Sequence, residues 1–261
     1  MLLKEKIVLF DMDGTLTPAR QRVERDMIIA LKKLSAHARI GIVTGSDYDY
    51  VLQQMSEAFE IGGVPVDRID ILPCNGTKKY TAGHDGNYQL VSKVDMIEKI
   101  GQSDYNFILQ NCVQWQSDIL QHYELPFTGV FFQYRGSLLN WCPIGRLASL
   151  DERNKWLQVD KNSNIRNSYC EKLTSKLSEK NIKVTVALGG TTSFDIYPTG
   201  WDKTYALKHY NDSDVWFAGD KCEPGGNDWH LYEKLSATNR AFKVDSPQDT
   251  IRLIDHLVSS I

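Results

Sequence analysis

The chain has 261 residues, of which 42% are hydrophobic and 24% are charged, and its formal net charge at pH 7 is −3. These proportions are ordinary for a globular protein, and they exclude disordered, collagen-like and coiled-coil chains. The near-neutral charge balance argues against a general binder of nucleic acid or of membrane surfaces, because such proteins usually carry a basic excess.

The first fifty residues alternate between strand and helix patterns. Residues 6–10 form a continuous apolar run, as a strand buried on both faces does. Apolar residues then recur at helical spacing from Met27 to Leu34, and residues 39–44 read as a second strand. Strand, helix and strand in this order, with both strands buried, predict a parallel sheet.

The middle of the chain follows a different pattern. We expect a helix from Asp95 to about Leu120, strands over residues 128–134 and 183–188, and a helix over 163–179 between those strands. After Trp201 the pattern of a parallel sheet returns, with a helix over 203–209, a strand over 215–218 and a closing helix over 250–260.

This order predicts an α/β protein in which one domain is inserted into another. The expected core comprises residues 1–84 and 200–261, and residues 85–199 form an inserted α+β domain, called the cap domain below.

The strongest chemical motif is Asp11-Met12-Asp13-Gly14-Thr15, directly after the first strand. Two carboxylates separated by one residue point the same way from an extended backbone. The carboxyl end of a parallel strand is where open α/β sheets bind ligands. Because two adjacent acids repel each other, the pair favours a hard cation such as Mg²⁺. Gly14 allows the chain to turn, and Thr15 offers donors to an oxyanion.

This motif resembles the signature of the haloacid dehalogenase superfamily, whose members transfer phosphoryl groups through an aspartyl-phosphate. The remaining motifs of that superfamily follow in order: a hydroxyl residue after the next strand (Ser46), a lysine that opens a later helix (Lys203) and an acidic pair after a strand (Asp220 and Asp228). The resemblance implies a Rossmann-like core with a parallel sheet.

Longer blocks resemble the eukaryotic-type phosphomannomutases across nearly the whole chain. They are residues 11–20, Gly45-Ser46-Asp47, Asn140-Trp141-Cys142-Pro143-Ile144-Gly145-Arg146, Ser193-Phe194-Asp195, residues 200–205, Gly219-Asp220-Lys221 and residues 224–228. The blocks around Arg146 and Asp195 lie in the inserted domain and are far more specific than the superfamily motifs.

The resemblance implies a role for each matching residue. Asp11 is the nucleophile and Asp13 is the general acid and base. Mg²⁺ is held by Asp11, by the backbone carbonyl of Asp13 and by Asp220, with Asp228 nearby. Phosphate and substrate are bound by Thr15, Arg20, Ser46, Arg135, Arg146, Arg153, Ser193, Asp195 and Lys203.

A mutase must hold a bisphosphate with one phosphate at the nucleophile and the other at a remote site. Arginine suits the remote site because its guanidinium binds a phosphate with two parallel hydrogen bonds. The resemblance implies interconversion of mannose 1-phosphate and mannose 6-phosphate, with glucose phosphates as further candidates. A hexose 1,6-bisphosphate is expected as activator. The resemblance also implies a homodimer formed through the cap domain.

Two other functions remain open. A sugar-phosphate phosphatase would use the same core motifs, because water and a sugar hydroxyl need the same general base. A non-catalytic sugar-phosphate sensor is disfavoured by the intact acidic pair, Lys203 and Asp220.

The sequence departs from the family pattern at several places. Thr44 precedes Gly45 where glycine is usual, and Lys79 lies in an altered segment after Asn75-Gly76. Trp141 and Cys142 replace smaller or more polar residues beside Arg146. Lys234 stands where an acid would supply a second cation site, so that second site is not predicted.

The expected compartment is the cytoplasm. No apolar run approaches the roughly 18 residues that cross a bilayer, and charges interrupt the stretch that a signal peptide needs. The five cysteines are odd in number and widely spaced, which predicts free thiols rather than a disulfide scaffold or a zinc site.

Overall fold

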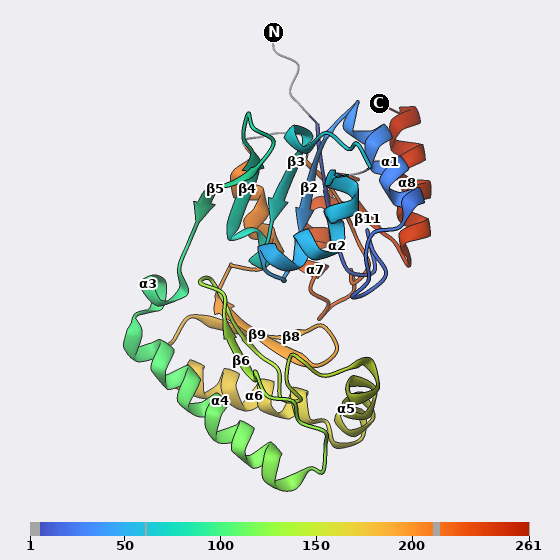
Figure 1. The fold of residues 1–261 in the computed structure, drawn as a ribbon. Coiled ribbons are helices and arrows are strands. Elements are labelled where there is room, and N and C mark those ends of the chain that lie inside the picture. The colour runs from blue at the N-terminus through green and yellow to red at the C-terminus, as the bar shows by residue number, and fades with distance from the viewer. Residues whose placement is uncertain (1–5, 61, 211–214, 261) are drawn as a thin grey trace. The chain divides into compact units, whose positions relative to one another are not determined.

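The computed structural model describes residues 6–60, 62–210 and 215–260. Two compact units are present (Figure 1): a core unit of Met1–Lys93 and Trp201–Ile261, and a cap unit of Val94–Gly200. The sequence analysis placed the first boundary between the two domains after residue 84, which is too early. Residues 83–87 form the turn of a hairpin, and its second strand pairs within the core sheet. The first break between the units therefore lies after Lys93.

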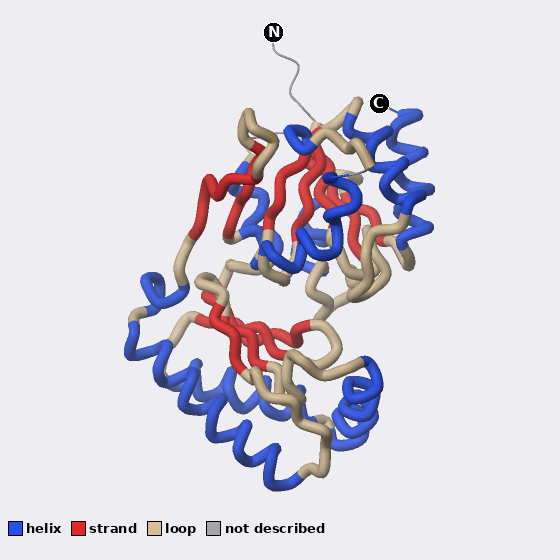
Figure 2. The backbone as a smooth tube through the Cα atoms, in the orientation of Figure 1, coloured by secondary structure: helices blue, strands red, loops and turns tan. Residues whose placement is uncertain are grey.

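The core unit is built on a seven-stranded sheet in the order β11-β10-β1-β2-β3-β4-β5 (Figure 2). The strands from β11 to β3 pair in parallel, and β4 and β5 are antiparallel. This confirms the predicted α/β class with a parallel sheet. The strands are β1 (Ile7–Phe10), β2 (Arg39–Val43), β3 (Ile69–Leu72), β4 (Lys78–Ala82), β5 (Tyr88–Lys93), β10 (Val215–Gly219) and β11 (Ala241–Lys243).

Alternate residues of β1 and β2 enter two separate hydrophobic clusters. Val8 and Phe10 pack with α1, α2 and α8, whereas Ile7 and Leu9 pack with η3 and α7. The central strands are therefore apolar on both faces, as the sequence pattern indicated. The helices of this unit are α1 (Arg25–Ser35), α2 (Tyr48–Glu60), η1 (Val66–Arg68), η2 (Cys74–Gly76), η3 (Lys203–His209), α7 (Trp229–Ser236) and α8 (Pro247–Ser260).

The cap unit contains a four-stranded antiparallel sheet in the order β6-β7-β9-β8. Its strands are β6 (Phe132–Tyr134), β7 (Leu139–Trp141), β8 (Val184–Gly189) and β9 (Ser193–Pro198). Its helices are α3 (Met96–Ile100), α4 (Gln102–His122), α5 (Leu150–Ser163) and α6 (Ile165–Glu179).

Backbone conformation explains where the predicted elements of the cap unit differ from the observed ones. The helix expected over Asp95–Leu120 is two helices, because Gly101 adopts a φ of 87° between them. The strand expected over 128–134 begins only at Phe132, after positive φ values at Gly129 and Val130. Helix α5 was not predicted, although Ser149 and Glu152 form a capping box at its start.

Trp141 belongs to the core of the cap unit. Its ring is fully buried, stacks on Phe194 with centroids 4.4 Å apart, and donates a hydrogen bond to the Gln116 amide oxygen at 2.7 Å. Trp141 is therefore a packing residue of the cap unit.

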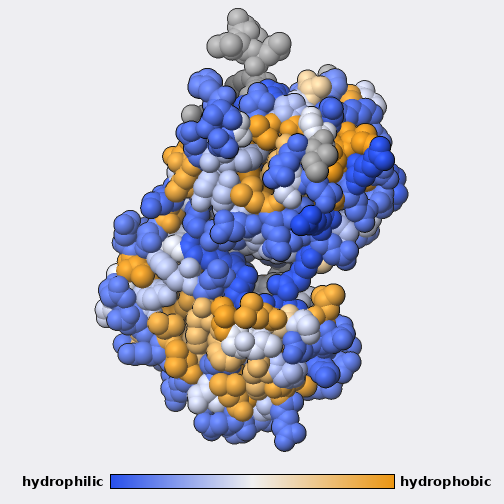
Figure 3. Space-filling model, in the orientation of Figure 1, coloured by the Kyte–Doolittle hydropathy of each residue, from blue (hydrophilic) through white to orange (hydrophobic). Residues whose placement is uncertain are grey.

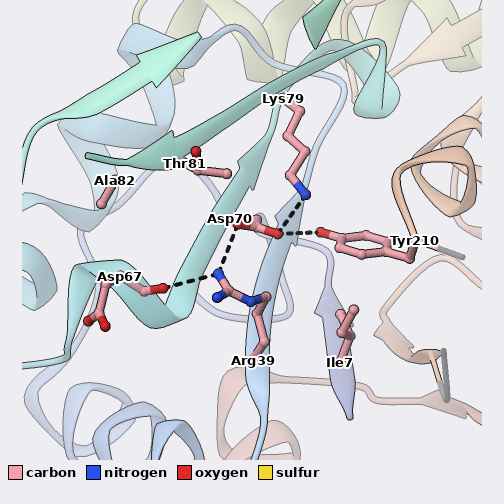
Figure 4. A pocket seen from close by; sticks show the side chains of 8 residues that line it. All are labelled: Ile7, Arg39, Asp67, Asp70, Lys79, Thr81, Ala82 and Tyr210. Carbon is pink, nitrogen blue, oxygen red and sulfur yellow. Dashed lines mark hydrogen bonds and ion pairs between the residues drawn. The ribbon is translucent and has the colours of Figure 1, made fainter. Parts of the chain in front are cut away.

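A cavity of about 440 Å³ lies at the edge of the core sheet where its parallel strands begin (Figure 4). Its wall carries the amino-edge cluster, which we define as Asp70, Arg39, Lys79 and Tyr210. The Asp70 side chain is 1% exposed; it accepts hydrogen bonds from Arg39 Nη1 at 3.2 Å and from the Tyr210 hydroxyl at 3.0 Å, and it pairs with Lys79 Nζ at 3.0 Å. The altered segment after Asn75-Gly76 thus supplies one of the two cations of this cluster.

Candidate functional site

The acidic motif extends the central strand at its carboxyl end. The backbone N–H of Asp11 donates to the Ala218 carbonyl at 3.0 Å, which continues the pairing of β1 with β10 by one residue. The chain then turns, and the Met12 carbonyl accepts hydrogen bonds from the N–H groups of Leu16 at 2.9 Å and Thr17 at 3.0 Å. Asp11 is thereby fixed beside the end of β10, where Asp220 follows.

Gly14 is required where the two acidic segments meet. Its φ is 90°, and a Cβ atom placed on it would lie 2.4 Å from Asp220 Oδ2. Any other residue would be strained and would displace this carboxylate. The glycine of the motif therefore permits the close approach of Asp220.

Three carboxylates and one lysine form the carboxyl-edge cluster, which we define as Asp11, Asp220, Asp228 and Lys203. One oxygen from each carboxylate lies within 4.8 Å of the others. Lys203 Nζ pairs with Asp11 Oδ1 and donates to Asp228 Oδ1 at 2.6 Å. The lysine side chain is 1% exposed, so its charge is neutralised entirely inside the protein.

The start of η3 positions Lys203. The Asp202 carboxylate caps this helix by accepting hydrogen bonds from the Thr204 N–H at 2.8 Å and the Thr204 hydroxyl at 2.6 Å. Lys203 is the next residue along the chain, so the cap holds the lysine backbone where its side chain reaches the carboxylates.

Burial and mutual repulsion perturb the ionisation of this cluster. Burial raises the pKa of Asp11 to about 7, although the charge of Lys203 opposes the shift. Burial also raises the pKa of Asp220. Burial disfavours the charge on Lys203, but Asp11 and Asp228 outweigh it and raise the pKa of this amine. Lys221, which is exposed, also lies 3.9 Å from Asp220 Oδ2, but Lys203 and Lys221 together do not neutralise three carboxylates.

The cluster fits a divalent cation. Asp220 Oδ1 is buried without a hydrogen-bond partner among the described residues. Carboxylate oxygens are the ligands that Mg²⁺ prefers. An acceptor without a donor, beside an excess of negative charge, is the environment in which a hard cation would be stabilised.

Asp13 is held through one of its two oxygens. Its Oδ1 accepts the Arg20 N–H at 2.8 Å and the Tyr50 hydroxyl at 2.9 Å. Arg20 has a φ of 61°, and its side chain is exposed. Tyr50 was missed by the sequence analysis, because it lies on α2 and the two residues meet only in the folded core unit.

Two further predicted donors lie in turns that follow the central strands, and one of them contacts Asp11. The Thr15 hydroxyl is 3.5 Å from Asp11 Oδ2. Ser46 lies in the turn after β2, where its N–H donates to Thr44 Oγ1 at 3.1 Å and its carbonyl accepts from the Cys74 N–H at 2.8 Å. The Thr44 hydroxyl, a departure from the family pattern, therefore supports the backbone of this turn.

The cap unit brings together another group of predicted residues. Arg146 Nη1 donates to Asn140 Oδ1 at 2.8 Å, and Asn140 Nδ2 donates to Asp195 Oδ1 at 2.7 Å. Ser193 lies on the same strand as Asp195 and is buried. Asn140 was quoted with the Arg146 block but was given no role.

Arg153 is anchored in the protein. It is 6% exposed, and its guanidinium donates to the Ala148 carbonyl at 2.9 Å, to Thr192 Oγ1 at 2.6 Å and to the Arg146 carbonyl at 2.8 Å. These bonds fix the backbone that carries Arg146. Arg135 is also buried; its N–H donates to the Leu138 carbonyl at 2.8 Å in the turn that joins β6 to β7.

Gly145 allows this loop to pass close to a neighbouring segment. Its φ is 97°, and a Cβ atom there would lie 2.4 Å from the Gly129 carbonyl oxygen. The residue before Arg146 must therefore be glycine, because a Cβ atom would clash with the neighbouring segment.

Among the described residues, no helix is both long enough and apolar enough to cross a membrane. The five cysteines are free thiols, as predicted.

Comparison with known proteins agrees with the residue pattern. A family model described as eukaryotic phosphomannomutase matches residues 27–260. Phosphomannomutase 1 of Mus musculus is 34% identical over 255 residues, covering 95% of this chain and 91% of the relative. Phosphomannomutase of Saccharomyces cerevisiae is 34% identical over 258 residues, covering 97% and 94%.

A solved structure shows the same fold at low sequence identity. The IMP-nucleotidase of Plasmodium falciparum, in its IMP-bound form, superposes with a TM-score of 0.65 at 12% identity, covering 99% of this chain and 69% of that chain. The core sheet with an acidic cluster at its carboxyl edge is thus of the haloacid dehalogenase type. Because the family model and these relatives span nearly the whole sequence, including the cap unit, the chain belongs to the eukaryotic phosphomannomutase family.

Proposed function

We propose that this protein is an isomerase that interconverts mannose 1-phosphate and mannose 6-phosphate. The observation that carries the proposal is the carboxyl-edge cluster, in which buried Lys203 contacts both Asp11 and Asp228. Beside them is Asp220 Oδ1, for which the described part of the chain offers no hydrogen-bond partner. Membership in the family supplies the substrate class. Glucose phosphates are further candidate substrates.

In the proposed reaction Asp11 attacks the phosphorus of a hexose 1,6-bisphosphate. An Asp11 oxygen–phosphorus bond forms, the bond between phosphorus and the sugar oxygen breaks, and Asp13 gives that oxygen its proton. In the reverse step the oxygen of a sugar hydroxyl attacks the phosphorus of the aspartyl-phosphate, and the bond between Asp11 and phosphorus breaks. Asp13 takes the proton of that hydroxyl. The bisphosphate both primes Asp11 and arises as the intermediate.

Fixed donors would stabilise the charge of the transferring phosphoryl group. Lys203, Thr15 and Ser46 are the proposed donors, and they act without reorganisation because their backbones are held by a helix cap and by turns. Asp11, the Asp13 carbonyl and Asp220 would hold Mg²⁺, with Asp228 nearby. When bound, the ion supplies positive charge beside the phosphate oxygens.

The cap unit is proposed to bind the remote end of the substrate. Arg146 would bind the second phosphate together with Arg135 and Arg153, and Arg20 would contribute from the core unit. Ser193 and Asp195 would bind sugar hydroxyls. Arg153 already donates to three protein oxygens, two of them carbonyls, so its proposed contribution includes fixing the backbone that carries Arg146.

A time course of phosphorus NMR on mannose 1-phosphate tests the proposal. With Mg²⁺ and a trace of hexose 1,6-bisphosphate, the signal of mannose 6-phosphate should grow without release of inorganic phosphate. Phosphate release without mannose 6-phosphate would reject the mutase and identify a sugar-phosphate phosphatase. No change in any signal, with folded protein and fresh bisphosphate, would favour a non-catalytic sensor.

Arg146→Ala separates the mutase from the phosphatase at a single residue. A mutase should lose at least roughly 100-fold in turnover, because a bidentate contact to a dianion is lost. A phosphatase that does not use a remote phosphate would lose little.

The proposed setting is a cytoplasmic homodimer formed through the cap unit. Hydrophobic residues lie at the surface of this unit in Figure 3. Its exposed large apolar residues include Val113, Leu120, Val130, Leu147 and Leu150. Sedimentation equilibrium should give twice the chain mass, and Val113→Glu tests whether α4 takes part. A single-chain mass for the wild-type protein would reject the dimer.

A further inference from the structure

The cap unit separates a cation and an anion with a neutral amide. Asn140 on β7 lies directly opposite Asp195 on β9, so their side chains project from the same face of the sheet. Arg146 reaches Asn140 from the loop that follows β7. The three side chains therefore form one row, with Asn140 in the middle.

The chemistry of the partners determines how the amide is oriented. A guanidinium can only donate, so the Asn140 oxygen must face Arg146. The Asn140 nitrogen donates to Asp195 Oδ1 at 2.7 Å and to the Phe194 carbonyl at 3.2 Å, which uses both of its hydrogens. Asn140 is 3% exposed, so this arrangement is held in the interior of the cap unit.

The amide prevents an otherwise favourable pairing. A guanidinium and a carboxylate within reach of each other form two parallel hydrogen bonds, and each then satisfies the other. Such a pair would leave Arg146 with less capacity for a phosphate and Asp195 with less capacity for a hydroxyl. Asn140 instead occupies one edge of each group and carries no charge itself.

We propose that Asn140 is a positioning residue that keeps Arg146 and Asp195 apart, so that both can bind one hexose phosphate. This inference rests on the proposed function, in which Arg146 binds phosphate and Asp195 binds a sugar hydroxyl. It adds that the spacing between them, set by one amide, selects a phosphate and a hydroxyl carried on the same ligand. Ligands that react only at the core unit do not need it.

The first test compares two substrates in Asn140→Ala. The KM for mannose 1-phosphate should rise roughly 10- to 100-fold, the factor expected when hydrogen bonds to charged groups are lost, with a smaller change in kcat. Hydrolysis of p-nitrophenyl phosphate, which carries no sugar, should change by less than about twofold. Asn111→Ala is the matched control, because Asn111 is also buried in the cap unit and bonds only a backbone carbonyl in the described contacts.

A double-mutant cycle tests whether Asn140 acts by keeping Arg146 away from Asp195. If Asn140 acts by keeping Arg146 off Asp195, then Asn140→Ala should raise KM by no more than about threefold in an Asp195→Asn background. The same rise in KM in the Asp195→Asn background as in the wild-type background would overturn the proposal. An unchanged KM in the wild-type background would also overturn it.

Two further measurements keep the outcome decisive. If Asn140→Ala melts much lower than the wild-type protein, Asn140→Ser retains a donor and an acceptor and should restore part of the affinity. If the wild-type protein does not turn over mannose 1-phosphate, the proposed function fails, and binding of mannose 1-phosphate by calorimetry then tests Asn140 separately. Equal affinity of the wild-type and Asn140→Ala proteins in that measurement would reject the role of Asn140.

Discussion

At the amino edge of the core sheet, Asp70 faces two cations and a tyrosine, whereas at the carboxyl edge three carboxylates share Lys203. Both clusters are buried, and both join segments that are far apart in the sequence. Asp70 is paired on both of its oxygens, but Asp220 retains an oxygen that has no hydrogen-bond partner within residues 6–60, 62–210 and 215–260.

This difference in charge balance separates a structural cluster from a reactive one. Removing the charge of Asp70 leaves the cations Arg39 and Lys79 uncompensated and costs stability. Removing a negative charge from the crowded cluster relieves repulsion and burial cost, and it costs activity instead. Substitutions in the two clusters should therefore affect different quantities.

The largest effect is expected for Asp11→Asn. Loss of the nucleophile should reduce mutase turnover by at least roughly 10³-fold. Mg²⁺ should raise the melting temperature of the wild-type protein and raise that of the variant much less, since one carboxylate ligand is gone. Coupled assays and thermal melts with and without Mg²⁺ measure both effects. Retention of wild-type turnover would remove Asp11 from the mechanism.

Asp70→Asn should do the reverse. It leaves Arg39 and Lys79 without their buried anion, and we expect a loss of about 3 kcal/mol in the free energy of unfolding. Turnover per folded molecule should remain within about twofold of the wild type, because the cluster lies where the parallel strands begin and not where they end. Urea denaturation and active-site titration measure the two quantities. A large loss of kcat with unchanged stability would contradict the contrast.

A matched pair of tyrosine variants sharpens the comparison with a smaller change. The Tyr210 hydroxyl donates to Asp70 Oδ2 at 3.0 Å, and the Tyr50 hydroxyl donates to Asp13 Oδ1 at 2.9 Å. Tyr210→Phe should cost about 1–2 kcal/mol of stability and little activity. Tyr50→Phe should cost about tenfold in mutase turnover and little stability, because the orientation of Asp13 is loosened. Tyr48→Phe, on the same helix as Tyr50, is the control.

The smallest effect concerns the pH dependence of stability. Burial raises the pKa of Asp11 from 3.8 to about 7, so the folded state holds a proton that the unfolded chain has released. The stabilisation from this proton is complete below about pH 4 and is lost as the pH rises through about 7. Without Mg²⁺, the melting temperature of Asp11→Asn relative to wild type should therefore rise between about pH 4 and about pH 7, the interval between the unfolded and folded pKa values of Asp11. A difference that does not change with pH would show that Asp11 is not perturbed.

The parts of the fold that sequence analysis predicted depend on local pattern. The buried strand before Asp11, the helical spacing from Met27 to Leu34 and the return of strand and helix after Trp201 are all visible within about ten residues. Two predicted boundaries differ from the structure, one of a helix and one between the domains. Gly101 divides one expected helix, and the second strand of the hairpin after Lys78 joins the core sheet.

The residues that were missed share a different property. Asn140 pairs with Asp195, Tyr50 pairs with Asp13, and Asp70 pairs with Tyr210 across sequence separations of 55, 37 and 140 residues. One signal was available for Asp70, since an acid inside the apolar run Ile69–Leu72 needs a buried partner. Nothing local identifies which residue that partner is.

The amino-acid sequence by itself determined that two acids follow a buried strand, that a lysine and a further acidic pair come later, and that an arginine-bearing insertion lies between them. Spacing and burial pattern are properties of residues that are neighbours in the chain, so they can be recognised without knowing the fold. The folded structure places Lys203 between Asp11 and Asp228, and it gives Asp70 two cations while the carboxyl-edge cluster keeps an excess of carboxylates. It also sets one amide between Arg146 and Asp195. The physical reason is that the energy of a buried charge depends on which groups surround it in space, and chain order does not specify those groups.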